Sequence, residues 1–189
     1  MKVLVTLALL CGMALAQSQT GSDSHLAIRP GAQDANEQHV AKEVRHELIM
    51  LPYYSIFDDL EFSVNGNNVT LLGSVVNPVL KKDAENVVKR VEGVSSVNNQ
   101  IKVLPPSPMD DGIRRQVARA ISNQDGLYRY FMGAVGSIHI IVDNGRVTLK
   151  GVVDNQSDEN MAKMAANQVP GVFSVTDNLQ VTNQTQAKR

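Results

Sequence analysis

Hydrophobic and polar positions alternate along the chain in two periods, one typical of helices and one typical of strands. Apolar residues lie at helical spacing between positions 40 and 51, before Pro52, and predict an amphipathic helix. Apolar and polar residues then alternate over 60–64 and again over 69–71. Because Asn65-Gly66 lies between these two stretches, they predict a β-hairpin with a tight turn.

A second helix and a third strand complete the predicted unit. Asn77-Pro78 is a helix start signal, since asparagine caps well and proline suits the first helical position. Apolar residues recur at helical spacing over 80–91, and Gly93 is a typical helix stop. Alternation returns over 97–103 and predicts a last strand. The predicted order is therefore α-β-β-α-β.

The whole unit occurs twice. Residues 69–73 (VTLLG) match 147–151 (VTLKG), and residues 93–97 (GVSSV) match 171–175 (GVFSV) at the same offset. The first helices align at a smaller offset, so the second copy carries a few extra residues around 133–137. The sequence therefore predicts an α+β fold of two tandem α-β-β-α-β modules. We expect each module to be a three-stranded mixed sheet covered on one face by two helices.

The N-terminal residues have the features of a secretory signal peptide. Lys2 precedes the apolar run 3–10, and Ala14-Leu15-Ala16 offers small residues for cleavage after Ala16. The run is too short to span a bilayer, which takes about 20 residues. Leu9-Leu10 precedes Cys11 where a lipoprotein site needs small residues, so we expect a soluble periplasmic protein without a lipid anchor. The expected organisation is a signal peptide (1–16), a disordered leader (17–34), a first module (35–104), a proline-rich linker (105–108), a second module (109–182) and a disordered tail (183–189).

The net charge and the cysteine and histidine content exclude several classes of function. The chain has 18 basic and 19 acidic residues, a net charge of −1, so it lacks the basic field that nucleic-acid binding requires. Cleavage after Ala16 removes the single cysteine and with it disulfide and thiol chemistry. The histidines His25, His39, His46 and His139 include no pair at metal-ligand spacing on a helix. We expect no metal, no cofactor and no enzymatic activity.

Six of the eight aromatic residues cluster between the first helix and the first strand of each copy: Tyr53, Tyr54 and Phe57, then Tyr128, Tyr130 and Phe131. One interpretation is that they close the end of each small core, because aromatic side chains bury large areas. The other is an amphipathic patch at a lipid headgroup boundary, where nearby cations meet anionic lipid. Those cations are Arg114, Arg115, Arg119 and Arg129 in the second copy, whereas Asp58, Asp59 and Glu61 flank the first patch. The second copy is therefore the better candidate for lipid binding.

The repeated strings resemble the BON domain. The matching residues are 69–75, Ala84 and 91–97 in the first copy, and 147–153, Ala162 and 169–172 in the second. The resemblance implies a non-enzymatic envelope protein, associated with osmotic stress, that binds anionic phospholipid surfaces peripherally. A chaperone-like or scaffolding role for envelope proteins is the alternative. We expect the family glycines to be structural, with Gly73 and Gly151 at the end of each hairpin and Gly93 and Gly171 at the end of each second helix.

Overall fold

The structure, a computed structural model, describes residues 35–133 and 135–182. The predicted signal peptide, leader and tail lie outside the described residues, as do Cys11 and His25. Within the described ranges, no helix combines the length and the apolar character needed to cross a membrane.

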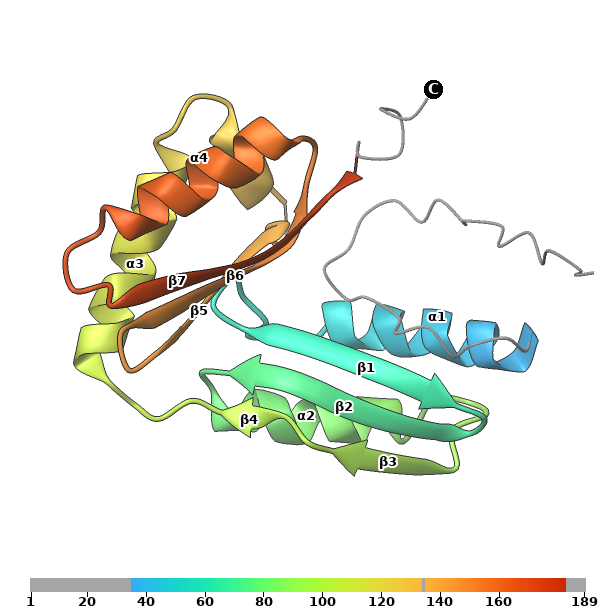
Figure 1. Cartoon of the computed structure of the whole chain (residues 1–189). Coiled ribbons are helices and arrows are strands. Elements are labelled where there is room, and N and C mark those ends of the chain that lie inside the picture. The colour runs from blue at the N-terminus through green and yellow to red at the C-terminus, as the bar shows by residue number, and fades with distance from the viewer. Residues whose placement is uncertain (1–34, 134, 183–189) are drawn as a thin grey trace, which may run out of the picture.

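The first copy, module 1, contains two helices and a small sheet (Figure 1). Its elements are α1 (Ala35–Ile49), β1 (Asp59–Asn65), β2 (Asn68–Val75), α2 (Pro78–Val88), β3 (Ser96–Asn99) and β4 (Lys102–Val103). The side chain of Asn77 accepts a hydrogen bond from the amide of Val79 at 3.0 Å and so caps α2, as the sequence predicts.

The second copy, module 2, repeats this order with one addition. Its elements are α3 (Pro108–Ser122), the short 3-10 helix η1 (Leu127–Phe131), β5 (Ile138–Asp143), β6 (Arg146–Val153), α4 (Gln156–Asn167) and β7 (Ser174–Val181). Ser107 caps α3 by accepting a hydrogen bond from the amide of Asp110 at 3.2 Å. The extra residues of the second copy follow η1 and lead into β5.

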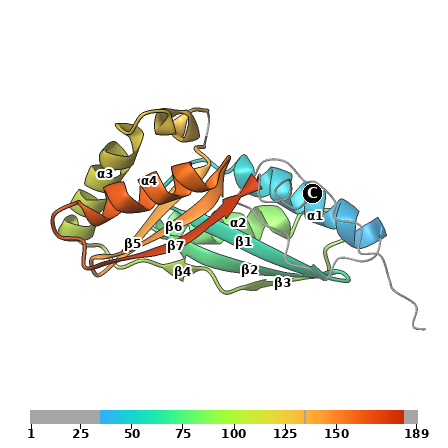
Figure 2. The same ribbon diagram turned by 45° about the horizontal axis from the view of Figure 1, so that its top comes forward.

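Both sheets have the same mixed topology. The hairpin strands are antiparallel, and the last strand of each module pairs in parallel with the second strand of the hairpin. Two helices cover one face of each sheet, α1 and α2 in module 1 and α3 and α4 in module 2 (Figures 1 and 2). The predicted α+β fold of two tandem modules is therefore confirmed.

The last strand of module 1 differs from the prediction. It was expected to run unbroken over 97–103, but it divides into β3 and β4, which both pair with β2. Between them, Ile101 turns its side chain into the core, where it is 1% exposed, and its amide bonds to the side chain of Asn99. The equivalent strand β7 is continuous over eight residues.

The two hairpin turns also differ. In module 2 the central turn residues are Asn144 and Gly145, both with positive φ as in a type I′ turn, which agrees with the prediction. In module 1 Asn65 pairs with Asn68, so the central residues are Gly66 and Asn67, one position later than predicted. Only the first of these has positive φ, as in a type II′ turn.

An acidic residue in the first turn of each N-terminal helix ties that helix to the hairpin turn. The carboxylate of Glu37 accepts a hydrogen bond from the amide of Gly66. At the equivalent place Asp110, which is buried, accepts from the amides of Asn144 at 3.1 Å and Gly145 at 2.8 Å. Glu37 and Asp110 therefore fix the hairpin turns against the helices of their own modules.

Gly73 and Gly151 lie at the open end of each hairpin, opposite Leu60 and Ile138, as the sequence predicts. β2 and β6 each continue for two residues beyond them. Their φ angles are positive, and a Cβ atom would lie 2.1 Å from the carbonyl oxygen of Asp59 and 1.9 Å from that of Ser137. The glycines are thus required by the close approach of the neighbouring backbone.

Gly93 and Gly171 also have positive φ, but each lies a short turn beyond the last helical residue of α2 or α4.

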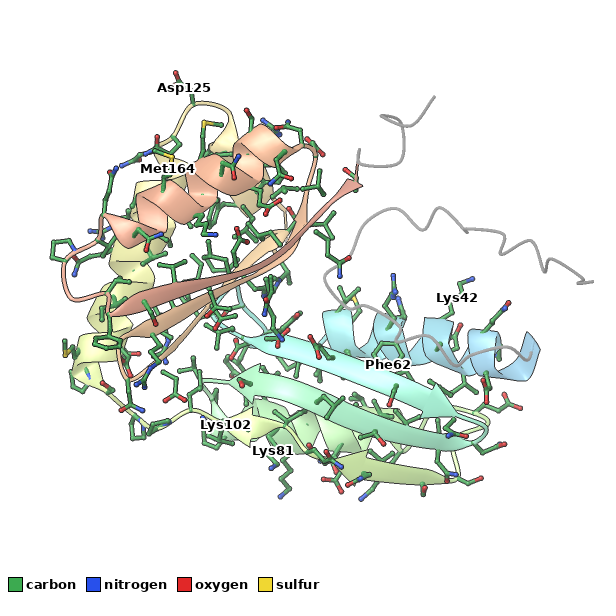
Figure 3. The ribbon with its side chains drawn as sticks, in the orientation of Figure 1. Lys42, Phe62, Lys81, Lys102, Asp125 and Met164 are labelled. Carbon is green, nitrogen blue, oxygen red and sulfur yellow. The ribbon has the colours of Figure 1, made fainter. Side chains whose placement is uncertain are left out.

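Each module has its own hydrophobic core between its sheet and its helices. Phe62 of β1 is fully buried in the core of module 1 and can be located in Figure 3. Lys102, also labelled there, lies on the stretch that leads from module 1 into α3.

Candidate functional site

The predicted residues of the first aromatic segment lie at the junction of the two modules. The segment between α1 and β1 runs along β5, where the amide of Ile140 donates to the carbonyl of Ile56 at 2.7 Å. The ring of His139 stacks on Tyr54 with centroids 5.6 Å apart, and its Nδ1 lies 2.5 Å from the carbonyl oxygen of Asp58. Module 1 thus covers the β5 edge of the sheet of module 2.

Apolar side chains cross this junction in both directions. Phe57 from module 1 packs, partly buried, against the core of module 2. Val135 from module 2 packs in the same way against the core of module 1. Tyr54 is buried within the core of its own module. For Tyr54 and Phe57, the structure therefore agrees with the interpretation that the aromatic residues close the cores.

A charged cluster joins the outer faces of the two sheets. Lys150 of β6 places its Nζ 2.5 Å from Asp59 and 2.8 Å from Glu61, both on β1. Burial raises the pKa of Asp59, and the bond from Lys150 opposes that rise. Burial also disfavours the ammonium form of Lys150, but the two carboxylates outweigh it and raise the pKa of that group. A further pair, Lys102 and Asp143, spans the junction at 2.5 Å.

Two buried groups complete the polar part of the junction. Burial lowers the pKa of His139 to about 4, so the imidazole is neutral near pH 7. Burial raises the pKa of Asp58, although its carboxylate accepts hydrogen bonds from the Ser55 amide and hydroxyl and from the Val76 amide. The two modules are thus joined by buried polar contacts as well as by apolar ones.

A pocket of about 270 Å³ lies between the aromatic segment of module 1 and the first half of α3. We call it the junction pocket, and its lining includes Tyr53, Phe57, Asn77, Asp111 and Arg115. It brings two predicted aromatic residues of the first copy together with predicted arginines of the second. The sequence instead placed these arginines beside the aromatic residues of their own copy.

The prediction for Arg114 is wrong, although this residue also borders the pocket. It is 2% exposed, with Nη2 donating to the carbonyl of Val142 at 2.7 Å and Nη1 bonded to Asp111. Its guanidinium holds the end of β5 against α3 and cannot meet a lipid headgroup. Arg115 and Arg119 are exposed, as the prediction requires, and neither forms an ion pair with a described residue.

Tyr53 has an unusual backbone conformation at the edge of the junction pocket. It follows Pro52 in a turn that the Tyr54 amide closes by bonding to the carbonyl of Leu51 at 3.4 Å. Its φ is +69°, a value that favours glycine or asparagine at this position of such a turn. The side chain is 74% exposed, so burial does not offset the backbone strain.

The second aromatic segment divides into a buried and an exposed part. Tyr130 is buried, and its hydroxyl donates to Asp158 at 2.5 Å and accepts from the amide of Asp154 at 2.9 Å. Burial and the neighbouring carboxylate raise its pKa to about 12. Arg129 stacks on the ring at 4.5 Å and pairs with the same two aspartates, so its charge is neutralised internally. Tyr130 therefore closes the core and is not part of a lipid-facing patch.

The other members of this segment lie nearer the surface. Phe131 is partly buried against the core of module 2, whereas Tyr128 is 61% exposed. Only Tyr128 therefore presents most of its ring to solvent, and the predicted patch around it is smaller than the sequence suggested.

An exposed apolar cluster that the sequence analysis missed lies at one end of module 2. We call it the tip of module 2, and it consists of Met109, Arg146 and Phe173. Met109 is 65% and Phe173 77% exposed, and the guanidinium of Arg146 lies 5.4 Å from the centre of the Phe173 ring. A Cβ atom on Gly171 would lie 3.8 Å from the terminal carbon of Met109, which places Met109 beside the loop that carries Phe173.

The tip is held by the backbone of three neighbouring segments. The Phe173 amide donates to the carbonyl of Gly145 at 2.8 Å, and the same turn is fixed to α3 by Asp110. Module 1 has the equivalent hydrogen bond, from Ser95 to Asn67 at 2.8 Å, with a serine in place of the phenylalanine. Aligning the two copies at their shared offset reveals this difference and was the signal available in the sequence.

Comparisons with known proteins identify the family of both modules. The family model for the BON domain matches residues 36–105 and again 109–183. No curated protein matches the chain. Within the described ranges, no three metal-ligating side chains lie close enough together to hold a metal ion.

Two similar solved structures are of CdsD, a structural protein of the Type III secretion system of Chlamydia trachomatis. The first is 14% identical, covers 73% of this chain and 90% of its own, and has a TM-score of 0.27. The second, a C-terminal domain, is 12% identical, covers 74% of this chain and 96% of its own, and has a TM-score of 0.26. These scores are too low to relate the arrangement of the two molecules.

Proposed function

The chain belongs to the BON domain family, with one copy of the domain in each module, and from this premise we propose that it binds anionic phospholipid surfaces peripherally through the tip of module 2. Membership of this family indicates an envelope-associated, non-enzymatic role, because the BON domain is generally not catalytic. The lipid surface and the residues that meet it are the part that we add.

The observation that carries the proposal is the composition of the tip. An aromatic and a thioether side chain are held in solvent by a loop and a helix start, although nothing in the described residues covers them. A cation lies on the aromatic ring, so apolar and positive groups face outward together. This combination suits the boundary of an anionic membrane, where rings enter the headgroup layer and arginines meet phosphates.

The magnitudes are those of weak, reversible binding. Inserting Phe173 removes most of an exposed ring from water, worth about 1.5–3 kcal/mol. Arg146 adds on the order of 1 kcal/mol near an anionic surface, and Arg119 adds less because it lies further along α3. A single module with these side chains associates with a membrane peripherally and does not anchor in it.

Sedimentation with vesicles tests the proposal. The mature protein is mixed with vesicles of phosphatidylglycerol or of phosphatidylcholine at low and high salt. We expect binding to phosphatidylglycerol that falls as salt rises, because the charge term is screened. Phe173→Ser, which installs the residue found at the equivalent place in module 1, should weaken binding by about tenfold.

Matched controls separate the tip from a general loss of apolar surface. Tyr128→Ser removes another exposed ring of module 2 and should leave binding unchanged. Ser95→Phe creates the ring in module 1, where Asn68 replaces Arg146, and should not restore binding to the Phe173→Ser variant. Absent or salt-independent binding by the wild type rejects the lipid surface. In that case the chaperone-like role predicts that the protein slows aggregation of an unfolded envelope protein without lipid.

A further inference from the structure

The junction pocket presents one positive and one negative group that are not fully used within the protein. Arg115 is exposed and forms no ion pair with any residue that the structure describes. Asp111 gives one oxygen to Arg114, but its side chain remains 45% exposed. Since the two lie four residues apart on α3, they are neighbours on one face of the helix.

The other two charged side chains of the pocket, Asp58 and Arg114, have partners within the protein, although the Nε atom of Arg114 has none. The carboxylate of Asp58 accepts three hydrogen bonds, two from Ser55 and one from the amide of Val76. Arg114 is fixed by Asp111 and by the carbonyl of Val142. A ligand with a single charge would therefore be attracted by one of the two available groups and repelled by the other.

The walls of the pocket limit the size and kind of the ligand. Its volume of about 270 Å³ lies below that of pockets for drug-sized molecules, which start near 300 Å³. Tyr53 and Phe57 provide aromatic walls, and ring faces attract ammonium groups. The volume and the aromatic walls of the pocket therefore suit a small group with an ammonium end.

We propose that the junction pocket binds a phosphoethanolamine-type zwitterion, a phosphate joined to a primary ammonium group by two carbons. Arg115 holds the phosphate, for which a guanidinium has the matching fork of donors. Asp111 and the ring of Tyr53 hold the ammonium group. The spacing of the two side chains on α3 selects a ligand whose charges are several atoms apart.

The strain at Tyr53 is consistent with this role. A tyrosine with φ of +69° and a largely exposed ring adds no burial to the fold. Strained residues that the surrounding structure maintains are frequent at ligand sites. The site is separate from the tip of module 2, so either can be wrong without the other.

An NMR titration of the mature protein tests the proposal. The probes are O-phosphoethanolamine, inorganic phosphate, ethanolamine and glycine, each added to a ¹⁵N-labelled sample. We expect O-phosphoethanolamine to shift the amides of residues 53–58 and 111–115, with a dissociation constant on the order of 1 mM. The other three probes should bind at least about tenfold more weakly, because each lacks one charge or the correct spacing. Equal binding by phosphate or glycine overturns the choice of ligand, and no shifts with any probe overturn the site.

Variants on one helix provide the controls. Arg115→Gln should weaken the binding of O-phosphoethanolamine by about tenfold, and Arg119→Gln, exposed one turn further along and outside the pocket lining, should leave it unchanged. Arg115 is exposed, so both variants are expected to fold, which the spectrum itself checks. Equal effects of the two substitutions contradict the proposal.

A second arm identifies the source of the zwitterion. The Phe173→Ser variant, in which binding through the tip is weakened, is sedimented with vesicles of phosphatidylethanolamine or phosphatidylcholine. The zwitterion is a lipid headgroup if the variant sediments with phosphatidylethanolamine and not with phosphatidylcholine. O-phosphoethanolamine should then reverse the sedimentation, and the double variant Phe173→Ser/Arg115→Gln should not sediment. Binding of the soluble probe without sedimentation assigns it to a free solute of the same chemistry. If Phe173→Ser sediments with phosphatidylglycerol as strongly as the wild type, the tip proposal fails, and the NMR result for the pocket is unaffected.

Discussion

Replacing Tyr53 by glycine should stabilise the protein while weakening its binding site. The residue has φ of +69° in the turn that follows Pro52. An L-residue in the left-handed region costs roughly 1–2 kcal/mol, and glycine avoids that cost. Glycine in turn has more freedom in the unfolded chain, which costs about 0.5–1 kcal/mol. The difference predicts that the free energy of unfolding rises by about 0.5–1 kcal/mol.

The loss of buried surface at Tyr53 does not cancel this predicted gain in stability. The tyrosine side chain is 74% exposed, so its removal uncovers little apolar surface of the core. Urea unfolding followed by circular dichroism measures the effect, and a rise of about 1 kcal/mol corresponds to a melting temperature about 2–4 °C higher for a chain of this length. The matched control is Tyr128→Gly, another exposed tyrosine but with an ordinary backbone inside η1. It should destabilise the protein by about 0.5–1 kcal/mol.

Equal changes in the free energy of unfolding for Tyr53→Gly and Tyr128→Gly would contradict the explanation by backbone strain. A loss of 1 kcal/mol or more in Tyr53→Gly would show that the ring makes contacts in solution that outweigh the backbone strain. The same variant should bind O-phosphoethanolamine more weakly than the wild type, because the pocket loses an aromatic wall. A more stable protein that binds less well is the signature of a residue retained for function.

Three further predictions concern the junction and the glycine positions. Lys150→Met should lower the free energy of unfolding by about 2–3 kcal/mol in the same urea assay, because it leaves the buried Asp59 unpaired. The double variant Lys150→Met/Asp59→Asn should recover part of the lost stability. Gly151→Ala should cost about 3 kcal/mol or more, since its Cβ would lie 1.9 Å from a carbonyl oxygen, whereas Gly112→Ala inside α3 should gain up to about 1 kcal/mol. The pKa of His139 is lowered from 6.5 to about 4 in the folded protein. As pH falls below 6.5, the unfolded chain therefore takes up a proton at this histidine and the folded chain does not. The free energy of unfolding should thus fall as pH drops from 6.5 towards 4. This contribution is at most about 3 kcal/mol, and urea titrations at several pH values should show it in the wild type and not in His139→Gln.

The repeated motifs were sufficient to predict the fold because each local signal agreed with the others. Asn77-Pro78 and Ser107-Pro108 start helices, and the two asparagine-glycine strings lie at hairpin turns. These signals act within a few residues, so they are readable from one stretch of chain. The break between β3 and β4 was not readable, because Ile101 continues the alternation of Val97 and Asn99, and β4 keeps the register of β3 on β2.

The site could be predicted only in part, since burial of a polar residue depends on partners far along the chain. Arg114 lies beside the apolar stripe of α3, and only the position of Val142 shows that its guanidinium is enclosed. Tyr128 and Tyr130 are two residues apart and chemically alike, yet Asp158 satisfies the hydroxyl of the second alone. The junction pocket combines segments from both modules, and no local pattern places one module against the other.

The contacts at the junction require the two copies to differ. The outer face of the sheet in module 2 carries His139 and Lys150, where the equivalent positions of module 1 carry Glu61 and Leu72. A contact between two unlike surfaces of one repeated unit is heterologous, and identical copies could add to it indefinitely. Substitutions at these positions give one copy the basic and the other the acidic half of the contact.

Equivalent positions of the two modules separate residues that the fold needs from residues that it does not need. The valine-threonine-leucine strings and the glycines are identical between the copies because both sheets need them. The backbone amide that Asp58 binds in module 1 is bound by the hydroxyl of Tyr130 in module 2, so even a shared structural task uses different side chains near the junction. Phe173 has no such structural task, since serine supports the same hydrogen bond in module 1. Its exposed ring is therefore best explained by a partner outside the chain, which is the reason for testing the tip against lipid before any other surface.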